Sequence, residues 1–501
     1  VFTGTSKSIQ NDLIESICFV IKNKTEEELQ KADFFSWEID ETTDITCKSQ
    51  LSVILRYVTD GELVERFTGF YDVSSGRNAE SLFQLLTKEF DRFDLKSKLI
   101  AQTYDGAAVM AGHLNSLQTK VKNIAPQALF THCYAHKLNL VLSKACNGIK
   151  DVRIFFSNLS GFSSFFSKSS KRSEVLNSIV KHRLPSNAPT RWNFSSRAVF
   201  TINSHRQKLI EVFDFISDSE EFLNDHQTLR EAYGLKRLLL DKNFIFYLKV
   251  FTMIFEQTDI IFQILQNRST DVNYSKDRLN SLIKKLKDFR TNEIHFNDLY
   301  NIFLDDANEN YTENEPGPSQ HKKRKTSFNL ERQDLHYKQI YAQILDIIIV
   351  QLETRFADIG ALQYFDLVNY ENFGTFSKEF PSNLLQELTK QYSSFDQISL
   401  KNELSVLYSD THLLGESTSV QEMVAFIYKN NLTDCLPQLY KLLCLVLSIP
   451  VTSASVERSF SALKRIKTYN RNRMSQDRLS NVSLIAIEKR LVSKLKENNS
   501  F

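Results

Sequence analysis

Residues that break helices are scarce in this sequence. Only 13 glycines and 8 prolines occur among 501 residues, whereas phenylalanine occurs 38 times. Few helix breakers and many aromatic side chains favour a mainly helical protein with a substantial hydrophobic core. At about 150 residues per domain, the length corresponds to roughly three domains.

The sequence also has few cysteines, a small net charge and no long apolar run. Six cysteines are too few for a disulfide framework, so we expect a reducing compartment. Lys and Arg total 62 against 60 for Asp and Glu, which leaves a net charge of +2. Any basic surface for a nucleic acid must therefore be local. The longest apolar run, residues 442–451, is too short to cross a bilayer, so no membrane association is expected.

The N-terminus has no targeting signal. The first ten residues, VFTGTSKSIQ, lack the charged and apolar regions of a secretory signal. The sequence begins with Val1 rather than with methionine, which predicts that it is a piece of a longer protein. The cytosol or the nucleus is the expected location.

The first third of the chain has an α/β pattern. Residues 34–40, 50–58 and 63–73 are β-type runs, and the turn at Thr59, Asp60 and Gly61 predicts a hairpin between the last two. Helical spacing follows at 78–90, then a strand at 99–104, a helix to about 123, a strand at 128–132 and a helix at 135–145. This order predicts a mixed five-stranded sheet covered by helices.

The rest of the chain is helical in pattern. Helical spacing covers residues 152–441 and 436–491, the latter with a break at Pro450. Residues 305–330 are polar and non-periodic and predict a disordered loop. The basic run at 321–325 within it is also the pattern of a nuclear-localisation signal, and a solvated loop is the alternative.

Two aspartates follow strands of the predicted sheet. Asp40 ends the first strand and Asp105 ends the fourth. Side chains at strand ends converge on one edge of a sheet, and carboxylate oxygens are the ligands that Mg²⁺ prefers. Either aspartate alone is as well explained by a turn or a helix cap. The order of strands favours a ribonuclease-H-like site with two metal ions.

A third acid, Glu457, opens a helix next to a basic strip. Val456, Phe460 and Leu463 form an apolar stripe, and Glu457 lies on an adjacent face. Six basic residues and no acid occur between residues 458 and 476. A carboxylate beside a basic strip fits metal ligation and phosphate contacts, while a solvated helix with mixed charges is the alternative.

Two further motifs have ambiguous chemistry. His132, Cys133 and His136 form an HCxxH block, but no second pair of ligands lies nearby, so zinc is not expected. Of Cys133 and His136, one is expected to be packed and the other to face the site. Arg191 and Trp192 could hold a phosphate and stack on an unpaired base. A half-buried tryptophan is an equal alternative.

Together these segments resemble the hAT superfamily of transposases, in its zinc finger MYM-type protein 1-like branch. The resemblance rests on FFSWEIDETTDITCKSQLSVILRYV (34–58), AQTYDGAAVMAG (101–112), THCYAHKLNLVL (131–142), PTRW (189–192) and LPQLYKLLCLVLSIPVTSASVERSFSALKRIKTYNRNRM (436–474). The last of these looks like the hAT C-terminal dimerisation region.

The resemblance implies an α/β ribonuclease-H-like core, with a mixed five-stranded sheet, interrupted by a large all-α insertion. The expected domains are a helical lead-in at 1–33, the first part of the core at 34–200, the insertion at 201–435, and the dimerisation region at 436–495 that completes the core. Family members carry a zinc-finger DNA-binding module before the core, and no matching Cys/His cluster occurs in this sequence.

The resemblance also implies which residues form the site. Asp40, Asp105 and Glu457 match the catalytic, metal-binding acids, with Asp44 as a rival for the first position and two Mg²⁺ or Mn²⁺ ions as cofactors. The side chains implied in DNA binding are Cys133, His136, Arg191, Trp192, Arg458, Lys464, Arg465, Lys467 and Arg471.

The implied activity is metal-dependent cleavage and transfer of DNA strands at transposon ends, in the nucleus. DNA and a second copy of the chain, in a homodimer or higher oligomer, are the expected partners, and no small-molecule substrate is expected. The alternative is a domesticated, non-cutting regulator that binds DNA or chromatin and dimerises.

Overall fold

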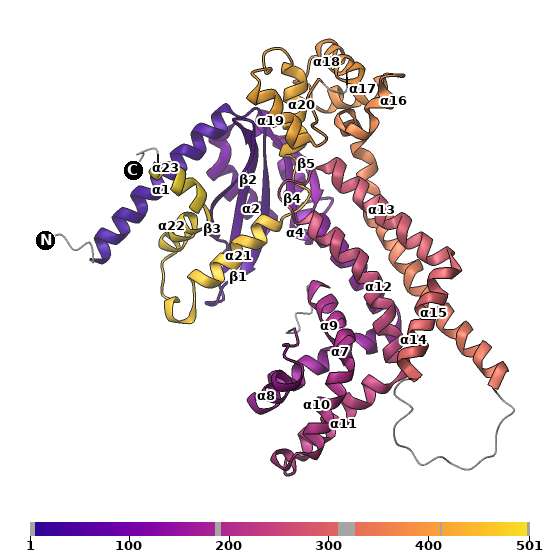
Figure 1. Ribbon diagram of the computed structural model, residues 1–501. Coiled ribbons are helices and arrows are strands. Elements are labelled where there is room, and N and C mark those ends of the chain that lie inside the picture. The colour runs from indigo at the N-terminus through magenta and orange to yellow at the C-terminus, as the bar shows by residue number, and fades with distance from the viewer. Residues whose placement is uncertain (1–5, 186–191, 309–325, 411–412, 498–501) are drawn as a thin grey trace, which may run out of the picture. The chain divides into compact units, whose positions relative to one another are not determined.

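The computed structural model describes residues 6–185, 192–308, 326–410 and 413–497. They form two compact units, which are described separately. The first comprises Val1–Lys137, Ile264–Asp277 and Asp358–Phe501, and the second comprises Leu138–Gln263 and Arg278–Ala357. Figure 1 shows the elements of both units along the chain. As predicted, the described residues combine a mixed sheet with a large helical region.

The first unit is built on a five-stranded sheet. Its strand order is β3-β2-β1-β4-β5. The pairs β3–β2 and β2–β1 are antiparallel, whereas β4 and β5 add in parallel on the other side of β1. This is the mixed sheet that the sequence predicts. The strands are β1 (Phe35–Thr43), β2 (Ser49–Thr59), β3 (Glu62–Asp72), β4 (Leu99–Tyr104) and β5 (Leu129–His132).

The predicted hairpin between β2 and β3 is present. Asp60 and Gly61 form a two-residue turn in which both φ angles are positive, at 50° and 73°. Turns of this kind match the twist of the flanking strands and favour Asp-Gly. The turn also sets the register: Thr59 pairs with Glu62, and Arg56 therefore pairs with Glu65.

Helices cover the sheet and extend the first unit. Before and between the strands these are α1 (Lys7–Lys31), α2 (Ala79–Phe90), η1 (Asp91–Phe93), α3 (Leu95–Lys98), α4 (Ala108–Ala111) and α5 (Leu117–Ile124). Towards the C-terminus they are η4 (Ala357–Val368), η5 (Tyr370–Asn372), α16 (Phe373–Phe376), α17 (Ser382–Gln391), α18 (Gln397–Ser409), α19 (Val420–Lys429), α20 (Pro437–Ser448), α21 (Ala454–Ile466), η6 (Tyr469–Arg471), α22 (Gln476–Ile487) and α23 (Lys489–Glu497).

The two faces of the sheet bury different sets of side chains. On one face, Trp37 and its alternating neighbours on β1 pack with Leu82 and Leu86 of α2 and with residues of α5. On the other face, Ile54 of β2 packs with Phe460 of α21 and with residues of α1 and α22. In Figure 1, α21 crosses this second face. Alternation along each strand therefore decides which side chains meet α21.

The second unit is all helical and rich in aromatic residues. Phe155 of α7 stacks on Phe251 of α12 with ring centroids 5.7 Å apart, and Phe246 contacts Tyr337 at 4.5 Å. These contacts explain much of the phenylalanine in the sequence. The helices are α6 (Tyr134–Gly148), α7 (Lys150–Ser167), α8 (Ser170–Ile179), α9 (Trp192–Ser204), α10 (Arg206–Asp218), η2 (Glu220–Phe222), α11 (His226–Leu240), α12 (Lys242–Leu265), α13 (Val272–Thr291), α14 (Glu293–Asn308) and α15 (Thr326–Arg355).

The compact units divide the chain differently from the predicted domains. Residues 138–200 belong with the helical unit, because Phe162 of α7 packs on Phe213 of α10. Residues 358–435 belong with the sheet, where Glu403 of α18 accepts the backbone N–H groups of Gln438 and Leu439. Most of the predicted loop, residues 309–325, lies outside the described residues, while α14 and α15 include its two ends.

Candidate active site

Asp40 lies within β1, and Asp105 directly follows β4, the strand that pairs with β1 in parallel. Glu38 of β1 pairs with Thr103 of β4, and each aspartate comes two residues later in the chain. Both are half-buried. The backbone N–H of Ala107 donates to the Asp105 carboxylate at 3.1 Å, which orders the turn after β4. β1 runs on to Thr43 and does not end at Asp40 as predicted, because Glu41 to Thr43 still pair with β2. The convergence of the two carboxylates stays a prediction.

Asp40 is on the sheet face that α21 covers. Asp40 pairs across the ladder with Ser52 of β2, so the two side chains point to the same face. The Ser52 hydroxyl lies 2.8 Å from the hydroxyl of Ser459 on α21. Likewise, the Thr103 hydroxyl donates to the carbonyl of Pro450, just before α21, at 3.0 Å.

Glu457 lies in the first turn of α21, two residues before Ser459. Its side chain is half-buried, and its apolar neighbours Val456, Phe460 and Leu463 are buried against the sheet. This confirms the predicted apolar stripe of the helix. The helix that carries the third acid therefore covers the sheet face that carries Asp40.

A buried carboxylate that the sequence analysis missed fixes the start of α21. The Glu65 side chain, on β3, is only 5% exposed and forms an ion pair of 2.9 Å with Arg56, which is 2% exposed. Glu65 also accepts a hydrogen bond from the hydroxyl of Ser455, and Arg458 donates to that same hydroxyl. Ser455 and Arg458 flank Glu457, so this network holds the turn that presents the third acid.

The same carboxylate binds a loop from another part of the first unit. Arg268 pairs with Glu65 at 3.1 Å, and its carbonyl accepts a hydrogen bond from Arg56 at 2.8 Å. Arg458 donates to the carbonyl of Gln266 at 3.2 Å. Arg56 and Glu65 are directly opposite each other in the hairpin, and the Asp-Gly turn could have predicted this pairing by counting back from Thr59 and Glu62.

Asp44, the rival for the first acid, has a structural role. One carboxylate oxygen accepts hydrogen bonds from the hydroxyl and backbone N–H of Thr46 and from the backbone of Lys48. The other accepts from Gln50 at 3.2 Å and from the ammonium of Lys467 at 2.6 Å. Burial alone would raise the pKa of Asp44, but these hydrogen bonds outweigh it and hold the pKa below its ordinary value. Asp40 is therefore the better candidate for the first acid.

Lys467, predicted to contact DNA, is a buried partner of Asp44. Its side chain is 3% exposed and that of Asp44 is 1% exposed. A cation enclosed in this way is not available to a phosphate group, which corrects the prediction. The spacing along α21 places Lys467 in the basic strip, but the loop between β1 and β2 reaches it and removes it from the surface.

Replacing Lys467 with methionine is expected to lower the free energy of unfolding by ~2 kcal/mol, because a charged hydrogen bond to a buried carboxylate is lost. The stabilisation should be present above the ordinary pKa of Asp, since the pKa of Asp44 is lowered in the folded state. It should be lost as the pH falls through that lowered value. Denaturant titrations at pH 7 and pH 3 would measure both effects, and exposed Lys464→Met on the same helix is the control.

Cys133 is packed, and His136 is half-buried at the same sheet edge. The thiol of Cys133 is 0% exposed, accepts the backbone N–H of Ser453 at 3.3 Å and lies 3.6 Å from the hydroxyl of Thr452. Burial raises the pKa of Cys133 above its ordinary value. The prediction that Cys133 contacts DNA is therefore wrong. Its thiol instead positions the residues that lead into α21.

His132 approaches the turn after Asp105 closely. A Cβ atom on Gly106 would lie 2.7 Å from Cε1 of His132, so only glycine allows this approach. The ring of His132 lies 5.5 Å from that of His136, centroid to centroid. The HCxxH block thus lines the edge at which Asp105 ends its strand.

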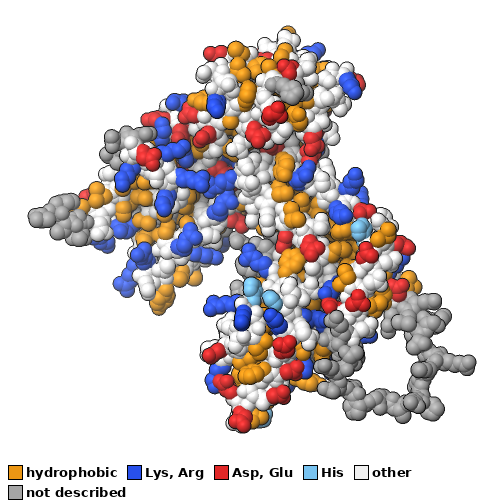
Figure 2. All heavy atoms as spheres, viewed as in Figure 1, with side chains coloured by type: hydrophobic (Ala, Val, Ile, Leu, Met, Phe, Trp, Pro, Cys, Tyr) orange, Lys and Arg blue, Asp and Glu red, His pale blue; other side chains and the backbone are white. Residues whose placement is uncertain are grey.

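The remaining basic candidates are at the surface. Lys464, Arg465 and Arg471 are exposed, and Arg458 is 44% exposed although it takes part in the Glu65 network. Figure 2 shows Lys and Arg side chains gathered over the region of α21 and α22. Of the other two candidates, Arg191 lies outside the described residues, and Trp192 begins α9 in the second unit. Their role in DNA contacts stays a prediction.

The donor chemistry of the three acids fits a hard divalent cation. Carboxylates are the ligands that Mg²⁺ and Mn²⁺ favour, and Asp40 and Asp105 each come two residues after a paired position of β1 and β4. Over the described ranges of the chain, no three His, Cys, Asp or Glu side chains lie close enough to hold a metal ion together. The metal triad stays a prediction.

Comparison with known families places two regions of the chain. Residues 2–116 match the family described as ZMYM1/FAM200, RNase-like domain, and residues 403–491 match the hAT family C-terminal dimerisation region. The chain thus has one region similar to an RNase-like domain and another similar to the hAT C-terminal dimerisation region.

Two relatives match the chain over almost all of its length. It is 23% identical to the 52 kDa repressor of the inhibitor of the protein kinase from Homo sapiens, over 96% of this chain and 65% of that protein. The protein of the same name from Mus musculus gives the same identity and coverage. The chain therefore spans less than two thirds of the length of these relatives. None of the described helices is both long and apolar enough to cross a membrane.

Proposed function

We propose that this chain is the core of a hAT-like transposase that binds DNA and cuts it with Asp40, Asp105 and Glu457. The proposal is supported by the parallel pairing of β1 with β4, since Asp40 and Asp105 each come two residues after the pair of Glu38 with Thr103, and by the helix of Glu457, which covers the sheet face of Asp40. We further propose that it works in the nucleus as a homodimer, for which the match to the hAT dimerisation region is the support.

Each residue has a distinct task in this proposal. The acids would provide oxygen ligands, and the chemistry supplied by Mg²⁺ or Mn²⁺ in such a site is activation of a water and stabilisation of a leaving oxygen. Lys464, Arg465 and Arg471 would hold phosphates near the carboxylates. The Glu65 network and Cys133 would keep Glu457 oriented, so that little reorganisation is needed during reaction.

DNA binding should depend on salt through the exposed basic residues. We expect Arg471→Ala to weaken binding of a labelled duplex at all sequences and to reduce the slope of log K against log salt by about 1. Fluorescence anisotropy at several salt concentrations measures this slope. Lys378→Ala removes an exposed charge just after α16 and is the control. Equal slopes for Arg471→Ala and the wild type would remove Arg471 from the DNA interface.

A second candidate function is a non-cutting regulator. The observation in its favour is the similarity to proteins whose name describes a repressor. Such a protein would bind DNA with the same salt dependence but would not nick it. Plasmid nicking in Mg²⁺ or Mn²⁺ by the full chain distinguishes the two candidates, because only the first requires Asp105.

A further inference from the structure

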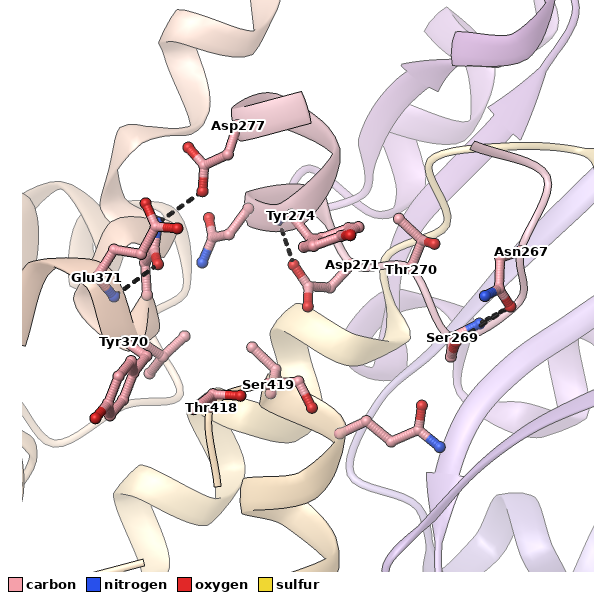
Figure 3. Close-up of a pocket in the computed structure, with 15 residues that line it drawn as sticks. Asn267, Ser269, Thr270, Asp271, Tyr274, Asp277, Tyr370, Glu371, Thr418 and Ser419 are labelled. Atoms are coloured by element: carbon pink, nitrogen blue, oxygen red, sulfur yellow. Dashed lines mark hydrogen bonds between the residues drawn. The ribbon is translucent and has the colours of Figure 1, made fainter. Parts of the chain in front are cut away.

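A polar cavity lies in the first unit, away from the three acids. Its volume is about 430 Å³, which is within the range of small-molecule sites. Three segments form it: the loop before α13 with the first turns of that helix, residues 368–371, and the start of α19. Figure 3 shows Asp271 pointing into the space above Thr418, with Asp277 and Glu371 together on one side.

The backbone donors around this cavity are already used. Asp271 accepts the N–H of Tyr274 at the start of α13, at 2.9 Å. The side chain of Glu422 accepts the N–H groups of Thr418 and Ser419, both at 3.1 Å, at the start of α19. Two helix N-termini would ordinarily attract an anion. Here the capping side chains occupy those N–H groups, so little is left for an anion to bind.

The acceptors, in contrast, are in excess. Asp271, Asp277 and Glu371 line the cavity, and no Lys or Arg is among its described lining residues. Asp271 is only 5% exposed, and burial raises its pKa. A cation that entered the cavity would therefore meet three carboxyl groups, of which Asp277 already accepts a hydrogen bond from the Asn369 side chain at 3.1 Å.

An unpaired buried acceptor points to the ligand. Asn273 is 4% exposed, and its Nδ2 donates to the carbonyl of Phe365 at 2.7 Å, which fixes the orientation of the amide. Its Oδ1 has no hydrogen-bond partner among the described residues. A buried acceptor without a donor costs free energy, so a ligand with N–H groups would complete this site.

We propose that the cavity binds an organic cation with several N–H donors, that is, an ammonium or guanidinium group. The volume exceeds what a bare ion needs, and the acceptors are spread over three segments. Two of these, 264–277 and the stretch from 358, connect the first unit to the second along the chain. A bound cation would tie these two connections to each other and to α19. A free polyamine and a basic side chain of another polypeptide share this chemistry.

Isothermal titration of the whole chain at physiological ionic strength tests the proposal, with spermidine and N-acetyl-arginine amide as probes. We expect saturable binding of at least one probe to the wild type and roughly tenfold weaker binding to Asp271→Asn and Glu371→Gln. Asparagine still caps α13, and Glu371 is exposed, so both variants should fold. Glu379→Gln, an exposed glutamate outside the cavity lining, makes the same charge change and should bind like the wild type.

The outcomes separate the sources of the ligand. Tighter binding of spermidine indicates a polyamine, and tighter binding of the arginine amide indicates a side chain. Equal binding by all four proteins would show non-specific attraction and overturn the site. The site would also be overturned if neither probe bound the wild type saturably. The same holds if Mg²⁺ alone bound the wild type and this binding were lost in Asp271→Asn and Glu371→Gln.

Discussion

Replacing Glu65 with alanine is expected to lower the free energy of unfolding by about 3–5 kcal/mol, because it leaves a buried charge without its partner. Arg56 is 2% exposed and has Glu65 as its ion-pair partner at 2.9 Å. Arg56 also donates to the carbonyls of Leu447 and Arg268, which do not neutralise its charge. Arg268 and Arg458 are about half exposed and can turn to solvent. Denaturant unfolding monitored by circular dichroism measures the change.

Glu62→Ala is the matched control on the same strand. The side chain of Glu62 is 74% exposed and lies 3.9 Å from that of Lys494. Exposed pairs of this kind contribute little, so we expect a change within about 0.5 kcal/mol. If Glu65→Ala and Glu62→Ala cost the same, the buried pair does not stabilise the first unit and the proposed anchoring of α21 has no energetic basis.

Glu38 gives a second check on this prediction. It is 1% exposed on the same face, and burial together with the nearby charge of Glu65 raises its pKa well above its ordinary value. Once Glu65 is removed, ionised Glu38 is placed to compensate Arg56 in part. We therefore expect the double variant Glu38→Gln/Glu65→Ala to lose more free energy of unfolding than the sum of the losses in the two single variants. Additivity would show that Glu38 does not respond to Glu65.

The local patterns of the sequence predicted most of the sheet and its site edge. The β-type runs predicted the strands, the Asp-Gly turn predicted the hairpin, and the apolar spacing of α21 predicted the buried Val456 and Phe460. The order of the elements predicted the mixed sheet in which β1 pairs with β4 in parallel. These features depend on neighbours close in the chain or on general rules of strand pairing.

Features that depend on distant segments could not be predicted. Lys467 belongs to the basic strip by spacing, but its environment is set by Asp44, 423 residues away. The positioning role of Cys133 likewise depends on Thr452 and Ser453. Helical periodicity also does not reveal which unit a helix joins, so the division of residues 138–200 and 358–435 between the units emerged only from packing.

Replacing Asp105 with asparagine is expected to abolish metal-dependent DNA nicking, with a loss of ~10³-fold or more. Stabilisation of transition-state charge by a metal site is worth several kcal/mol, and each 1.36 kcal/mol is tenfold in rate. Asparagine can still accept the N–H of Ala107 that Asp105 accepts at 3.1 Å, so the turn after β4 should survive. The measurement is the rate of nicking of a supercoiled plasmid by the full chain in Mn²⁺ or Mg²⁺.

Asp396→Asn is the control for this substitution. Asp396 accepts the backbone N–H of Ser399 at 2.7 Å at the start of α18, and asparagine is an equally good cap. We expect its nicking rate to equal that of the wild type. A second readout is binding of Mn²⁺, measured by calorimetry, which should weaken in Asp105→Asn and not in Asp396→Asn. If Asp105→Asn nicks and binds Mn²⁺ like the wild type, the acids at the strand ends are not the catalytic centre. If neither the wild type nor the variants nick DNA, but DNA binding keeps its salt dependence, the result supports the non-cutting regulator.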